Sequence, residues 1–240
     1  MFIKKILQII NIKNFNQYQK PILTIIAISF ILSLIISAIA IIDSPDDYQQ
    51  SNAVKIMYIH VPSAWMSLII YSLMALFNIC GFIFRNRFFY LISQSIAKIG
   101  LIFTAITLIT GAIWGRPIWG TWWAWDARLT SMLILFFLYC GYILTVNNFD
   151  NMIKGEKVAA IISIIGFINI PFIKFSVEYF NSLHQPASII RSKGVAIHPA
   201  MLKPLLLSFI TCFLYFLLIT MIDLKTRLIA SKINRKINIS

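Results

Sequence analysis

Six long apolar runs, separated by short polar or charged segments, constrain this chain more than any other feature of its sequence. A helix needs about 20 mostly apolar residues to cross the hydrocarbon core of a bilayer, where it satisfies its own backbone hydrogen bonds. Because 59% of the 240 residues are hydrophobic and only 12% are charged, one water-soluble core could not bury them. We therefore predict an all-α integral membrane protein, a single domain over 1–240, with six transmembrane helices at about 21–42, 61–84, 96–113, 129–146, 158–175 and 204–222.

The distribution of lysine and arginine between the loops predicts the orientation, since cytoplasmic loops carry the excess of positive charge. The two termini and the turns at 85–98 and 147–157 hold 14 of the 21 basic residues, and the other loops hold seven. We therefore predict cytoplasmic termini in a bacterial inner (cytoplasmic) membrane or, as the alternative, matrix-side termini in a mitochondrial inner membrane. The net charge of +13 does not indicate nucleic-acid binding, because the basic residues stand at the ends of apolar runs.

The predicted outer-face loop at 114–128 is unusually rich in tryptophan. A tryptophan belt at a membrane interface normally needs one or two such residues per helix end. Five of the six tryptophans of the chain lie in this loop: Trp114, Trp119, Trp122, Trp123 and Trp125. This density favours a binding surface over a simple membrane anchor.

The spacing within this loop predicts a platform. Pro117 and the flanking glycines predict a turn at 115–118. A short helix after that turn would place Trp119, Trp122, Trp123 and Asp126 on one face. Such a face suits a large flat apolar ligand or the flank of another protein, and Arg116 and Arg128 beside it suit carboxylates. A flat apolar body with carboxylates at one edge describes haem.

The three histidines, His60, His184 and His198, all fall on the predicted outer side. His60 ends the first outer loop, His184 lies midway along the largest outer loop, and His198 precedes the last apolar run, where it could cap an interface. A lone loop histidine is usually solvated, but neutral imidazole is also a common axial ligand of haem iron. The three cysteines lie within apolar runs without C-x-x-C spacing, so a thiolate metal site is not expected.

The segment W-G-x-P-x-W-G-T-W-W-x-W-D-A-R-L-T at 114–130 resembles the WWD signature of haem-handling membrane proteins. That family includes haem exporter protein C of cytochrome c maturation (CcmC) and the longer haem lyases. In CcmC proteins, one haem-ligating histidine stands in an H-V-P-x-A-W context before the second span, and another stands in an L-H-Q context in the last outer loop. His60 and His184 match these contexts, whereas His198 matches neither. Chain length and span count favour the CcmC branch.

The resemblance implies that haem b is bound transiently and without covalent attachment, with His60 and His184 as axial ligands. The tryptophans and Asp126 would form the haem platform and contact a periplasmic haem chaperone (CcmE), while Arg128, with Arg116 or Lys55, would pair with the propionates. Asp126 itself would orient Arg128 or a loop N–H. Further partners would be a small membrane subunit (CcmD) and an ABC transporter pair (CcmA, CcmB).

Three alternatives remain open at the level of the sequence. A haem lyase would attach haem to apocytochrome c, an electron-transfer protein would hold b-type haem inside the bilayer, and a scaffold would only dock a partner. Neither a P-loop nor a catalytic Ser/His/Asp or paired-carboxylate pattern occurs in the sequence, so we do not expect an enzyme. Iron held through haem is the only metal that we expect.

Overall fold

The computed structural model describes residues 12–180, 182–184, 194 and 196–237. Those ranges contain no β-strand beyond an isolated bridge between Asp47 and Ser51. The helices are α2 (Ile12–Ile42), the short 3-10 helix η1 (Asn52–Ile56), α3 (Met57–Phe84), α4 (Arg87–Trp119), α5 (Ala127–Asn148), α6 (Met152–Gly166), α7 (Asn169–Tyr179) and α8 (Pro199–Ile237).

Six helical stretches are long and apolar enough to cross a membrane, which confirms the predicted six-span, all-α membrane protein. The helices extend beyond the apolar runs because polar residues cap them: Asn86, Asp126 and Asn151 each accept a hydrogen bond from a backbone N–H of the first turn. The fifth span combines α6 and α7, which are separated at 167–168. Pro171 explains this break, because its ring would clash with a preceding carbonyl if α6 continued.

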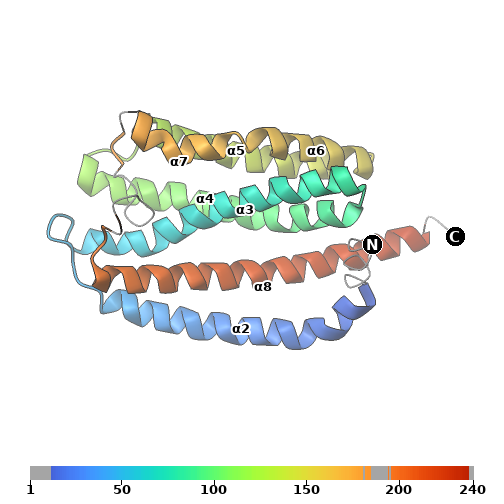
Figure 1. Ribbon diagram of the computed structural model, residues 1–240, viewed down its shortest axis with the longest axis horizontal. Helices are drawn as coiled ribbons and strands as arrows, with labels where there is room; N and C mark the ends of the chain where they lie inside the picture. The colour runs from blue at the N-terminus through green and yellow to red at the C-terminus, as the bar shows by residue number, and fades with distance from the viewer. Residues whose placement is uncertain (1–11, 181, 185–193, 195, 238–240) are drawn as a thin grey trace.

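The helices lie side by side along the long direction of the molecule (Figure 1). The α3 helix packs most extensively against α4, α2 packs against α8, and α5 packs against α6. The buried core includes Met66, Ile70 and Tyr71 of α3 together with Leu135 and Tyr139 of α5. Most side chains of α2 in its apolar window are exposed, as expected for a helix that faces lipid.

The two ends of the bundle differ in character (Figure 1). The loops at 43–51 and 120–126 lie at one end with the close of α7 and the start of α8, and we call it the tryptophan end. The turns at 85–86 and 149–151 lie at the other end, the terminal end, with the start of α2 and the close of α8. Several charges used for the orientation, Lys4, Lys5, Arg191 and Lys193 among them, lie outside the described residues. The orientation therefore stays a prediction.

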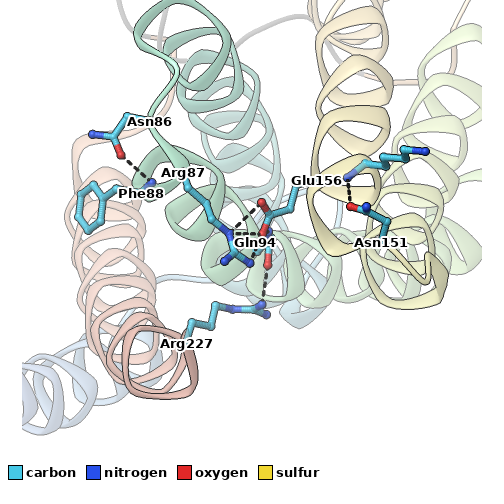
Figure 2. A network of polar contacts seen from close by, with 8 residues as sticks. Asn86, Arg87, Phe88, Gln94, Asn151, Glu156 and Arg227 are labelled. Atoms are coloured by element: carbon cyan, nitrogen blue, oxygen red, sulfur yellow. Dashed lines mark hydrogen bonds and ion pairs between the residues drawn. The ribbon is translucent and has the colours of Figure 1, made fainter. Parts of the chain in front are cut away.

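A buried carboxylate ties three helices together at the terminal end (Figure 2). Glu156 of α6 is only 4% exposed and accepts hydrogen bonds of 2.8 and 3.0 Å from the Arg87 guanidinium of α4. Gln94 donates to the same carboxylate at 3.3 Å and accepts a hydrogen bond of 2.8 Å from Arg227 of α8. A buried charge is tolerated only when it is paired and hydrogen-bonded in this way. The network therefore fixes α6 and α8 against α4.

Candidate functional site

The connection between α4 and α5 is shorter than the sequence predicts. The expected turn at 115–118 is wrong, because α4 continues through Pro117 to Trp119. Pro117 removes one backbone hydrogen bond and its ring crowds the carbonyl of Ile113, yet α4 continues two residues further and ends at Gly120. Gly120 has a φ of 73°, the left-handed conformation that glycine adopts readily at a helix C-terminus. Only 120–126 is left outside a helix.

The predicted short helix after the turn is also wrong. A glycine that ends α4 and an aspartate that caps α5 leave too few residues between them for another helix to nucleate. Trp114 and Trp119 therefore belong to the last turns of α4, and the other three tryptophans belong to the loop. Trp122 and Trp125 are 58% and 79% exposed. Trp123 packs edge-on against Trp125, with ring centroids 5.5 Å apart. The buried indole N–H of Trp123 has no hydrogen-bond partner in the part of the chain that the structure describes.

His60 lies in the first turn of α3 and not in a loop, because η1 and α3 begin before it. Its ring packs edge-on against Trp114, with ring centroids 5.6 Å apart. Its Nδ1 lies 3.1 Å from the Thr110 hydroxyl, and that hydroxyl donates its proton to the Ile106 carbonyl at 2.6 Å. Since a threonine hydroxyl has one proton, Thr110 accepts from Nδ1–H of His60. This tautomer leaves Nε2 with a free lone pair, as a metal ligand requires.

His184 follows α7 and packs against the other tryptophan of α4. The ring centroids of His184 and Trp119 are 4.9 Å apart in an edge-on arrangement. Nδ1 of His184 lies 3.5 Å from Oδ2 of Asp126. Ser182 joins the same residues, since its hydroxyl donates to Asp126 Oδ2 at 2.6 Å and accepts from the backbone N–H of His184 at 3.1 Å. Asp126 thus faces the second predicted ligand.

The burial of His184 favours a neutral imidazole beside an ionised carboxylate. Burial lowers the pKa of His184, Arg128 lowers it further, and Asp126 opposes both effects. Burial alone would raise the pKa of Asp126, but hydrogen bonds from the Leu129 N–H and from Ser182, together with His184, bring that pKa below its usual value. An ionised carboxylate can only accept, so the proton of the neutral imidazole is expected on Nδ1.

Asp126 also organises the start of α5. Its Oδ1 accepts a 2.7 Å hydrogen bond from the backbone N–H of Leu129, and its side chain is only 7% exposed. Arg128, two residues further on, donates to the Ser176 hydroxyl at 3.4 Å and to the Lys174 carbonyl at 3.3 Å. These long hydrogen bonds leave part of the guanidinium available to a second acceptor, since arginine has five N–H donors.

The other two predicted propionate partners contact the protein elsewhere at the tryptophan end. Arg116 is exposed and donates to the carbonyl of Gly120. Lys55 lies 3.7 Å from a carboxylate oxygen of Asp46 and donates to the Ile42 carbonyl at 3.3 Å. Arg128 is therefore the one of the three whose charge acts directly on His184.

Three residues of this site were not identified from the sequence. Thr110 and Ser182 contact the predicted ligands, and Gln50 accepts a 2.9 Å hydrogen bond from the indole N–H of Trp114. Thr110 precedes Trp114 by one helical turn and could have been found from that spacing, whereas Gln50 and Ser182 carry no such signal. His198 is exposed, and its Nδ1 accepts from the Ala200 N–H at 3.3 Å at the start of α8.

Comparison with known proteins gives consistent matches. Residues 5–238 match the sequence model of the family described as heme exporter protein C. The chain is similar to heme exporter protein C of Bradyrhizobium diazoefficiens, with 40% identity over 190 residues, 79% of this chain and 72% of that protein. It is 43% identical over 179 residues to heme exporter protein C of Haemophilus influenzae, covering 73% of each. A putative cytochrome c biosynthesis ccmC-like mitochondrial protein of Marchantia polymorpha is 49% identical over 170 residues, 71% of this chain and 72% of that protein.

Proposed function

Because the chain belongs to the heme exporter protein C family, we propose that it binds haem b non-covalently at the tryptophan end and delivers it to a haem chaperone outside the membrane. That family has a role in haem export for cytochrome c maturation, and this member is a multi-pass membrane protein. His60 and His184 would be the axial ligands. The tryptophan end would then face the periplasm of a bacterium. The mitochondrial relative supports an intermembrane-space location as the alternative.

The observation that carries the proposal is the matched setting of the two imidazoles. Each has a tryptophan of α4 at its ring and a group that can accept a proton from Nδ1, so each can present Nε2 to a metal. Trp114 and Trp119 are five residues apart, which corresponds to about 7.5 Å along a helix and about 140° around it. Both histidines therefore pack against the last turns of one helix.

The residues around the histidines fit a porphyrin. Among the described residues, no group of three or more His, Cys, Asp or Glu side chains could hold a bare metal ion. A pair of imidazoles suits an iron whose other four ligands come from a macrocycle, and haem supplies that iron when bound. Trp114, Trp119 and Trp123 would contact the macrocycle, and the N–H of Trp123, which no described residue accepts, could meet a polar group on it. Arg128, with Arg116 or Lys55, would pair with the propionates.

The exposed tryptophans suggest how haem leaves. Trp122 and Trp125 present large apolar surfaces at the edge of the site, and such surfaces often mark a protein contact. We assign them to the contact with the chaperone (CcmE). The small membrane subunit (CcmD) and the ABC transporter pair (CcmA, CcmB) are proposed as further partners within the membrane.

The test is the visible spectrum of the detergent-purified protein, made in cells with and without the chaperone. The wild-type protein should show a six-coordinate haem spectrum that accumulates without the chaperone. His60→Ala and His184→Ala should each lose six-coordination, and the matched control His198→Ala should retain it. Unchanged spectra in both ligand variants would refute the assignment. Haem transfer to the chaperone without thioether formation on an apocytochrome c would distinguish delivery from lyase activity.

A further inference from the structure

The two predicted iron ligands are supported by groups of different charge. On the side of His60, the acceptor is the neutral hydroxyl of Thr110, whose own proton is already committed to the Ile106 carbonyl. On the side of His184, the acceptor is the Asp126 carboxylate. The imidazoles would therefore differ in basicity if each bound iron through Nε2, because the partner of Nδ1–H tunes the electron density of the ring.

We propose that Asp126 is a positioning residue that makes His184 the stronger of the two axial ligands, so that His60 dissociates first when haem leaves. This inference rests on the proposed function, since it concerns the strength of the same two ligands. It assigns the carboxylate to the back of a ligand, away from the haem platform on which the sequence placed it.

The geometry supports a fixed carboxylate and a ligand that closes on it. The backbone N–H of Leu129 in α5 holds Oδ1 of Asp126, and the Ser182 hydroxyl holds Oδ2. Among the described residues, Nδ1 of His184 is buried without a hydrogen bond, and the 3.5 Å gap to Oδ2 exceeds the usual 2.7–2.9 Å of a charge-assisted bond by about 0.6–0.8 Å. Because Asp126 is anchored at a helix end, a small shift of His184 is the simplest way to complete this bond.

The charge and the helix cap can be separated experimentally. In Asp126→Asn, a side-chain oxygen can still accept from Leu129 N–H, and asparagine is as good a cap as aspartate. The substitution removes the negative charge behind His184. Thr110→Val is the matched change behind His60. It removes a neutral hydrogen-bond acceptor, and valine has nearly the same volume as threonine.

The experiment uses the full-length haem-loaded protein in detergent. Two quantities are measured: the reduction potential, and the rate of haem loss to excess apomyoglobin. Asp126→Asn should raise the potential, since the ferric iron loses an anion-supported ligand, and should speed haem loss about tenfold more than Thr110→Val does. That factor is the expected difference between a hydrogen bond to a charged group and one to a neutral group. The melting temperature should stay close to that of the wild-type protein.

An unchanged potential in Asp126→Asn, or equal effects of the two variants, would overturn the inference. If Asp126→Asn did not fold, the single-ligand variants would decide, because His60→Ala should release haem more slowly than His184→Ala, and the reverse order would refute the proposal. The outcomes also separate it from the proposed function. A wild-type protein without haem, or without two histidine ligands, would refute the function, whereas a two-histidine haem that does not respond to Asp126 would refute only the inference.

Discussion

Gly115 offers the most direct test of the role of Trp119. It lies one helical turn before Trp119, and the indole packs over the position where a side chain would begin. A Cβ at 115 would lie 2.8 Å from Cε3 and 3.0 Å from Cζ3 of Trp119. Carbon atoms in contact are normally about 3.5–4.0 Å apart, so Gly115→Ala should displace the ring by about 0.5–1 Å. The displaced ring also contacts His184, with centroids 4.9 Å apart.

The energies predict a variant that folds but binds haem less tightly. Overpacking of this kind costs about 1–3 kcal/mol, and replacing glycine by alanine within a helix returns about 1 kcal/mol. The net change in the free energy of unfolding should therefore be about 0–2 kcal/mol, and the variant should fold. If Trp119 positions both haem and His184, a loss of about 1.4 kcal/mol in binding lowers haem affinity about tenfold.

The measurement is a haem titration of the purified variant, followed at the Soret band, with the melting temperature recorded in parallel. Gly141→Ala is the matched control, because a Cβ at that position of α5 meets no atom within 4 Å. The control should bind haem as the wild-type protein does. If Gly115→Ala bound haem as tightly as Gly141→Ala, Trp119 would not be part of a rigid binding surface.

Three further changes probe the rest of the molecule. Gln50→Leu removes the acceptor that holds the Trp114 indole at 2.9 Å, and a haem titration should show an affinity several-fold lower. Arg87→Ala leaves the Glu156 carboxylate buried with only the hydrogen bond from Gln94. Thermal unfolding in detergent should show a loss of about 2–3 kcal/mol in the free energy of unfolding. This is below the usual range for buried ion pairs because Arg87 is 39% exposed. Trp125→Ala should leave the melting temperature nearly unchanged, since that side chain is 79% exposed, but should slow haem transfer to the chaperone in a transfer assay.

The sequence predicts the spans well because the length of an apolar run is set by the bilayer. It predicts their ends poorly, because a cap such as Asn86 or Asp126 starts a helix outside the apolar run. The turn at 115–118 is wrong for a related reason. A proline disfavours a helix but does not by itself fix where the helix ends: α4 accommodates Pro117 and ends only at Gly120, whose left-handed backbone terminates it.

The candidate site, too, is only partly predictable from the sequence. The residue types and their order along the chain indicate His60, His184 and the tryptophans as functional. The contacts between them do not follow from sequence, because Gln50 reaches Trp114 across 64 positions and Ser182 reaches Asp126 across 56. Only the packing of α3, α4 and the segment after α7 brings such residues together.

If this chain delivers haem, as we propose, unequal support of its two histidines would suit the release of that haem. Two strongly supported ligands would hold haem tightly but would make its transfer slow, whereas one weaker ligand allows the iron to exchange partners while the other still holds it. On our proposal, the neutral hydroxyl of Thr110 makes His60 that weaker ligand, and Asp126 keeps His184 bound. Because Asp126 also caps α5, a movement at the start of that helix would change the support of His184. A partner that contacts the adjacent Trp125 could therefore weaken the second ligand only once it is in place to receive the haem.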